Sequence, residues 1–125
     1  MPLRAELTIR ADGVYLLTLD GRLDNQTYKD CEKKIGPILT PLPKNVIIDM
    51  GGLVYITSVG LRVIMNLKKT VDANKGRLSM INVQPQILKV LEIVNAMPTE
   101  SVFSNLEEAD RYYDMMQKKV LSEKK

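Results

Sequence analysis

The alternation of two kinds of apolar pattern constrains the fold of this chain more than any other feature. Short runs with strand character occur at residues 5–10, 14–19, 46–50 and 77–83. Between and after them, apolar side chains repeat at helical spacing along residues 28–39, 58–71, 85–94 and 106–120. Strands that alternate with helices are typical of a largely parallel sheet covered by helices. We therefore predict a single α/β domain with a mixed, mostly parallel sheet of about four or five strands, and with about four helices.

Punctuating residues set the expected boundaries of these elements. Asp12-Gly13 predicts a turn that joins the first two strands into an N-terminal hairpin. Asp24 or Asn25 is expected to cap the first helix, which Gly36-Pro37 should end or kink. A short further strand is expected near Val102-Phe103.

A loop is expected after the third strand, at residues 51–57. It opens with Gly51-Gly52, which we interpret as a tight turn rather than as a phosphate-binding loop. No Walker-type or GxGxxG pattern accompanies the two glycines. The next helix then begins at Ser58.

The net charge of +3 is concentrated at one end of the chain. Residues 118–125 contain four lysines and one glutamate, and the charges of the remaining residues cancel. We expect 118–125 to be a frayed, solvated tail. A DNA-binding domain would instead gather basic charge on a folded face, so nucleic-acid binding is disfavoured.

The length and the cysteine content bear on location. The 125 residues fit one domain, here 1–125. We find neither a secretory signal pattern nor an apolar run long enough for a membrane span, and expect a cytoplasmic protein without a membrane partner. The single cysteine, Cys31, is expected to pack a helix in a reducing compartment. A monomer is the expected state.

The inventory of reactive side chains disfavours an enzyme. The chain has no histidine, which removes the commonest general base and the commonest metal ligand. One cysteine cannot build a zinc site, so we expect no metal and no cofactor. Asp20, Asp24 and Asp49 lie at predicted strand ends, where caps and turns explain them best. A small enzyme or ligand-binding domain that uses Asp24, Asp49 and Ser58 remains as an alternative.

Two adjacent hydroxyls, Thr57 and Ser58, stand where a loop meets an apolar helix. One hypothesis is that Ser58 caps the helix, its Oγ accepting a hydrogen bond from the amide of Gly60 or Leu61. The other is that Ser58 is phosphorylated. The free amides and partial positive charge of a helix N-terminus favour an added phosphate, which would turn a neutral surface anionic.

Several segments together carry a resemblance to a known family. They are Gly21-Arg22-Leu23-Asp24, Val46-Ile47-Ile48-Asp49, Leu53, Ile56-Thr57-Ser58-Val59-Gly60-Leu61-Arg62 and Pro85. In their order and spacing they resemble the STAS family, specifically the bacterial anti-sigma factor antagonists. The chain departs from the family pattern at Thr57, where many members have Asp.

The resemblance implies a phosphorylation switch. Ser58 would be the phosphorylated serine, with Thr57 as the alternative, and Asp24 would lie nearby. The unmodified protein would bind an anti-sigma factor that is also a GHKL-type serine kinase. Phosphorylation would release it, and a serine phosphatase would restore it. The expected partner-binding residues are Leu23, Asp24, Asn25, Tyr55, Ile56, Thr57, Ser58, Val59, Gly60, Leu61 and Arg62.

A second interpretation keeps the fold and changes the partner. STAS domains also serve as scaffolds or accessory proteins in stress signalling, secretion and lipid transport, and are attached to anion transporters. Such a protein would need no sigma factor. A serine at position 58 favours the regulatory interpretation.

Overall fold

The computed structural model describes residues 2–10, 13–96 and 103–123. Its elements, in chain order, are strand β1 (Arg4–Arg10), strand β2 (Val14–Leu23), helix α1 (Tyr28–Ile35), the 3-10 turn η2 (Gly36–Ile38), strand β3 (Asn45–Ile56), helix α2 (Ser58–Ala73), strand β4 (Arg77–Ile81), helix α3 (Pro85–Ala96) and helix α5 (Leu106–Glu123).

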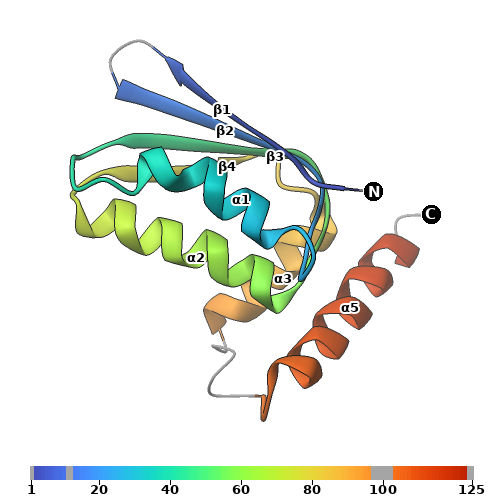
Figure 1. Ribbon diagram of the computed structural model, residues 1–125. Coiled ribbons are helices and arrows are strands. Elements are labelled where there is room, and N and C mark those ends of the chain that lie inside the picture. The colour runs from blue at the N-terminus through green and yellow to red at the C-terminus, as the bar shows by residue number, and fades with distance from the viewer. Residues whose placement is uncertain (1, 11–12, 97–102, 124–125) are drawn as a thin grey trace.

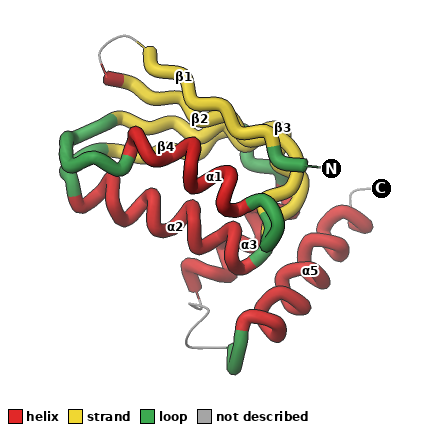
Figure 2. The backbone as a smooth tube through the Cα atoms, in the orientation of Figure 1, coloured by secondary structure: helices red, strands yellow, loops and turns green. Residues whose placement is uncertain are grey.

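The four strands form one mixed sheet in the order β1-β2-β3-β4. β1 and β2 make the antiparallel hairpin, whereas β2, β3 and β4 are parallel neighbours. Helices α1 and α2 lie side by side across one face of the sheet, and α5 lies beyond the end of the sheet where β3 turns into α2 (Figures 1 and 2). The predicted fold class is therefore confirmed, with four strands and four α-helices in the described residues.

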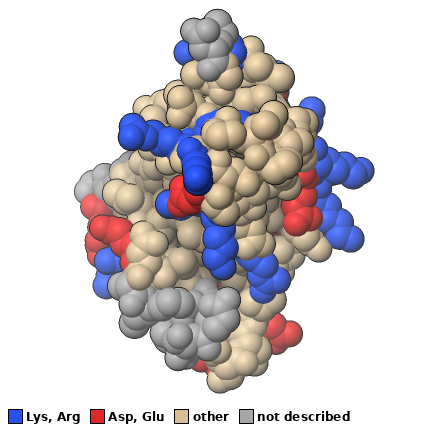
Figure 3. Space-filling view, turned by 90° about the vertical axis from the view of Figure 1, so that its left-hand side faces the viewer, with Lys and Arg blue, Asp and Glu red and all other residues tan. Residues whose placement is uncertain are grey.

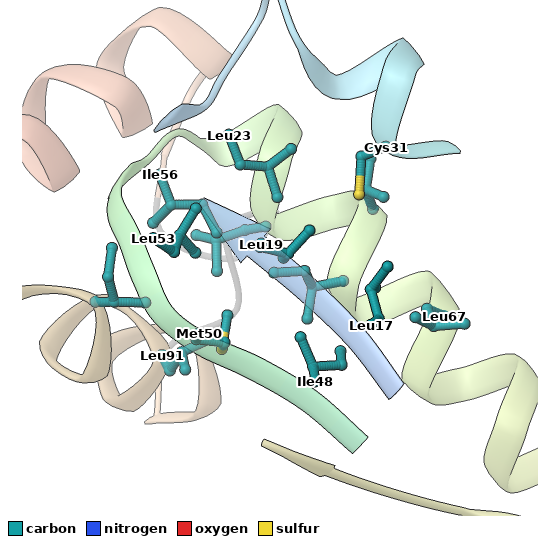
Figure 4. Close-up of a cluster of buried hydrophobic side chains, with 14 of the residues drawn as sticks. Leu17, Leu19, Leu23, Cys31, Ile48, Met50, Leu53, Ile56, Leu67 and Leu91 are labelled. Atoms are coloured by element: carbon teal, nitrogen blue, oxygen red, sulfur yellow. The ribbon is translucent and has the colours of Figure 1, made fainter. Parts of the chain in front are cut away.

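The core fills the space between the sheet and its helices. Leu17 and Leu19 of β2 and Ile48 of β3 point toward α1 and α2 (Figure 4), and each is at most 1% exposed. Their alternation with more exposed residues along each strand is the period-2 pattern of a sheet with one covered face. Cys31 packs there as predicted, 1% exposed.

The loop predicted at 51–57 is wrong, because β3 continues through Ile56. It stays paired with the end of β2, where Gly52 lies opposite Asp20 and Ile56 opposite Leu23. A side chain at position 52 would collide with the carboxylate of Asp20. Gly51-Gly52 therefore does not make a tight turn: Gly52 permits a close approach of two strands.

One helix boundary, the start of α1, differs from prediction. The N-cap of α1 is Thr27, because Asp24 instead accepts hydrogen bonds from the amides of Gln26 and Thr27 and so forms the preceding turn. Gly36 ends α1 as predicted, and the chain continues into η2. The strand expected near Val102-Phe103 lies mostly outside the described residues, and Phe103 itself is irregular.

Helix α5 extends to Glu123, so the frayed tail predicted at 118–125 is wrong for residues 118–123. Lys118 forms an i,i+4 ion pair with Asp114, which supports the helix there. Residues 124–125 lie outside the described residues. On the face shown in Figure 3, Lys and Arg side chains occur at several separate places among acidic and uncharged ones.

The N-terminus of α2 packs directly on the backbone of β2. A Cβ atom at position 60 would lie 2.5 Å from the carbonyl oxygen of Leu23. The amide of Thr57 donates to the same carbonyl at 3.1 Å. Glycine at position 60 is therefore required by contact with backbone, which a side-chain rotation cannot relieve.

We predict that Gly60→Ala destabilises the fold by about 1–3 kcal/mol, because the added methyl group overpacks this contact. Gly36→Ala is the matched control, since nothing lies within 4 Å of its Cβ position. The control should be neutral or stabilise the fold by up to about 1 kcal/mol. Urea unfolding of both variants measures the difference, and equal stabilities would contradict the close contact.

Candidate functional site

The predicted switch residues lie where β3 passes into α2. This junction faces the segment after β2 on one side and helix α5 on the other (Figure 1). Thr57 is the single residue between the strand and the helix. The parallel pairing of Leu23 with Ile56 brings the 24–27 turn beside this junction.

Thr57, not Ser58, is the N-cap of α2. Its backbone is extended, and its Oγ1 accepts a hydrogen bond from the amide of Gly60 at 3.4 Å. The same hydroxyl donates to Oδ1 of Asn25 at 2.9 Å. The capping role proposed for Ser58 is therefore wrong, because the preceding residue already fills it.

Ser58 is the first residue of α2 and is 5% exposed. Its Oγ is buried and has no hydrogen-bond partner among the residues that the structure describes. Its amide donates to Oδ1 of Asp110, on α5, at 2.8 Å. A carboxylate thus occupies the anion-favouring end of the helix, next to an unused hydroxyl.

Helix α5 makes two further polar contacts with the junction. The fully buried side chain of Gln117 accepts from the amide of Ile56 at 3.0 Å and donates to its carbonyl at 2.8 Å. The hydroxyl of Tyr55 donates to Oδ1 of Asp114 at 2.6 Å. Three successive turns of α5 therefore bind residues 55, 56 and 58.

Charged groups surround the Tyr55 ring. The Arg22 guanidinium lies 3.9 Å from the ring centroid and also pairs with Asp24 at 3.6 Å. Burial and the bond to Asp114 raise the pKa of Tyr55 to about 12. The hydrogen bonds from Tyr55 and Lys118 lower the pKa of Asp114. Both pKa shifts favour the state in which the Tyr55 phenol is neutral and the Asp114 carboxylate is ionised.

The predicted partner-binding residues divide into two groups by exposure. Leu23, Ile56, Ser58, Gly60 and Leu61 are buried. The surface of the junction is formed by Asp24, Asn25, Tyr55, Thr57, Val59 and Arg62, all partly or fully exposed. The structure thus brings every predicted residue to one region, but only the second group presents side chains to a partner in this conformation.

Two clefts flank the exposed side of α2. The first, of about 430 Å³, extends from Ser58 along Arg62 and Lys69 to Leu106 at the start of α5. The second, of about 440 Å³, lies between α1 and α2 and is lined by Asn25, Tyr28 and Val59 among others. Arg62 lines both clefts and places a cation between them.

Two of the carboxylates considered for catalysis, Asp49 and Asp24, have structural roles. Asp49 accepts from the amide of Gly51 and from the side chain of Asn82. Asp24 holds the 24–27 turn. Within residues 2–10, 13–96 and 103–123, no group of three or more potential metal-ligating side chains comes together. None of the helices in these ranges has the length and apolarity needed to cross a membrane.

Sequence reasoning missed the three α5 residues that hold the junction. It identified only the apolar stripe of this helix, which includes Ala109 and Tyr113. Asp110, Asp114 and Gln117 follow the same i, i+4, i+7 spacing one position further on. A polar stripe at helical spacing next to an apolar stripe was the signal that could have found them.

We predict that Tyr55→Phe removes a phenol that titrates near pH 12. Because its pKa is raised above the ordinary value of 10.0, the Tyr55 contribution to stability is complete below about pH 10 and is lost as pH rises through about 12. Phenolate absorbance against pH measures the loss. Tyr28→Phe, on α1, is the control and should keep the titration step near pH 12. If that step remained in Tyr55→Phe, the contact of Tyr55 with Asp114 would be contradicted.

The comparisons with known proteins agree with this fold. The family model for the STAS domain matches residues 7–109. BtrV of Bordetella bronchiseptica, provisionally named an anti-sigma factor antagonist, is 27% identical over 84 residues, which cover 67% of this chain and 72% of BtrV.

Solved structures extend the likeness. The anti-sigma factor antagonist SpoIIAA from Bacillus, solved unphosphorylated and phosphorylated, gives a TM-score of 0.59 in both forms at 19% identity. The unphosphorylated form covers 72% of this chain and 83% of SpoIIAA. The murine anion transporter Slc26a9 gives 0.57 at 15% identity, covering 82% of this chain and 18% of the transporter. With its fold and most of its length matched, the chain belongs to the STAS domain family.

Proposed function

We propose that this protein is an anti-sigma factor antagonist that works by partner switching in the bacterial cytoplasm. Its unphosphorylated form binds an anti-sigma factor that is also a GHKL-type serine kinase, and so frees the sigma factor. Phosphorylation of Ser58 ends that binding, and a serine phosphatase restores it. The protein acts by binding and needs no cofactor.

The observation that carries the proposal is the position of the Ser58 hydroxyl. It stands at the first residue of a 16-residue helix, and no described residue bonds it. The names of BtrV and SpoIIAA, and the phosphorylated structure of SpoIIAA, support the same assignment. A hydroxyl kept for structure would be expected to have a partner in a buried place.

The exposed residues around the junction form the partner surface. Arg62 is part of this surface, and Arg22 lies beside it, paired with Asp24. A phosphate at Ser58 adds about −1.5 to −2 charges to this mixed surface. A kinase surface complementary to the neutral serine would have to remove water from the phosphate or place its own negative charge against it. Either costs binding free energy, so the complex dissociates.

The alternative function is that of a STAS scaffold or accessory protein without a sigma factor, in stress signalling, secretion or lipid transport. The similarity to the domain within Slc26a9 is the observation that favours it. In that case Ser58 would stay unmodified, and partners would bind the same surface constitutively.

We predict that incubation with ATP and a GHKL-type kinase adds one phosphate, detected by intact mass. Ser58→Ala should abolish the gain, and Thr57→Ala should retain it. A phosphate that persists in Ser58→Ala but disappears in Thr57→Ala would transfer the switch to Thr57. An absence of phosphate on the wild type with every candidate kinase of the source bacterium would favour the scaffold function.

Binding to the same kinase gives the second readout. Ser58→Ala should bind and not be released by ATP, whereas Ser58→Asp should bind at least about tenfold more weakly if charge at this position governs the complex. Ser79→Asp, on the exposed surface of β4, is the matched control and should bind like the wild type. Equal affinities of the two aspartate variants would refute the electrostatic release.

A further inference from the structure

The buried state of Ser58 conflicts with its proposed modification. A kinase must bring the γ-phosphate of ATP to Oγ, yet this atom is buried beneath neighbouring residues. The neighbours include Arg62 and Leu106, which line the same cleft as Ser58, and Asp110, which bonds its amide. The serine therefore becomes accessible only if some of these neighbours move.

Helix α5 is the element that holds this region closed. Its residues Asp110, Asp114 and Gln117 bond Ser58, Tyr55 and Ile56 respectively. These residues lie beyond position 109, where the match to the STAS family model ends. The contacts therefore come from the part of this chain that lies outside the matched region.

We propose that α5 is a displaceable cover over Ser58, and that docking of α5 and phosphorylation of Ser58 exclude each other. This inference rests on the proposed function for the identity of the modification. Its structural part, the covering of Ser58 by α5, stands without it.

Competition for one anion site explains the exclusion. The Asp110 carboxylate already accepts from the Ser58 amide at the positive end of α2. A phosphate on the adjacent Oγ would place about −1.5 to −2 charges against that carboxylate. The two anions repel each other and compete for the same amide, so the phosphorylated form favours an undocked α5. By linkage, undocking must favour phosphorylation to the same extent.

The remaining contacts of α5 allow a local movement. Its apolar stripe, with Ala109 and Tyr113 fully buried, packs against α3, and Phe103 contacts the rings of Tyr112 and Tyr113. The ring contacts do not involve the junction residues 55–58. Helix α5 also packs on α2, though less extensively than on α3, so the polar stripe can leave Ser58 while the helix stays attached to α3.

The test measures access to position 58 without a kinase. Ser58→Cys places a thiol there, and its labelling rate with a maleimide is compared with that of Ser79→Cys on exposed β4. Cys31 stays slow, since burial raises its pKa to about 11, and peptide mapping separates the two sites. We expect position 58 to label at least about tenfold more slowly than position 79, because reaction requires a local opening.

A second substitution identifies the cover. Asp110→Ala in the Ser58→Cys protein removes a charge-assisted hydrogen bond and should speed labelling about tenfold. Asp110→Asn, which keeps an acceptor oxygen, should give a smaller increase and serves if the alanine variant folds poorly. Glu107→Ala, an exposed acid of the same helix, is the control and should change nothing. Labelling at the rate of position 79, or no response to either Asp110 variant, would overturn the proposal.

Hydrogen exchange tests the reverse direction. Ser58→Asp should speed exchange within residues 106–123 and at the amide of Ile56, which Gln117 bonds, and leave the amides of β2 and of β3 before Ile56 unchanged, whereas Ser79→Asp should affect none of them. Unchanged exchange in α5, or an equal increase throughout the chain, would refute a local cover. These results are independent of the kinase experiment: absence of phosphate would reject the proposed function while slow, Asp110-dependent labelling would still establish the cover.

Discussion

The contact between the backbone of Leu23 and the first turn of α2 underlies the whole switch region. Its carbonyl accepts from the amide of Thr57 and leaves no room for a side chain at position 60. This contact aligns the end of β2 with the start of α2, and so brings Asn25 within 2.9 Å of the Thr57 hydroxyl. With Thr57 engaged as the cap, the Ser58 hydroxyl has no hydrogen-bond partner in the part of the chain that the structure describes.

The second constraint comes from α5, which completes the junction from the other side. Gln117 satisfies both backbone groups of Ile56, which are buried and would otherwise be costly to leave unpaired. Asp110 does the same for the amide of Ser58. The helix thus stabilises the end of β3 and covers the proposed phosphorylation site with the same polar stripe. In the proposed switch, stability and regulation would be coupled, because both would use these contacts.

Local sequence patterns predicted the elements well and their limits poorly. The alternating strand at 5–10 and the apolar seam of α2 identified a face that must be buried. The prediction of a tight turn at Gly51-Gly52 was wrong. A glycine that permits two strands to approach closely cannot be distinguished from a turn glycine unless the neighbouring strand is known. Likewise, lysines 118 and 119 suggested a tail, although their helix is held by Tyr113 and Gln117 on its buried face.

The sequence by itself determined the α/β order of elements, the start of a helix at Ser58 and the absence of histidine chemistry. These follow from periodicity, from residue types and from motif spacing, all of which are local. Only the tertiary structure decided that Thr57 takes the cap and that Asp110 takes the free amide of Ser58. Hydrogen-bond partners 52 to 61 residues apart are chosen by how helices pack on a sheet, and no local pattern encodes that choice.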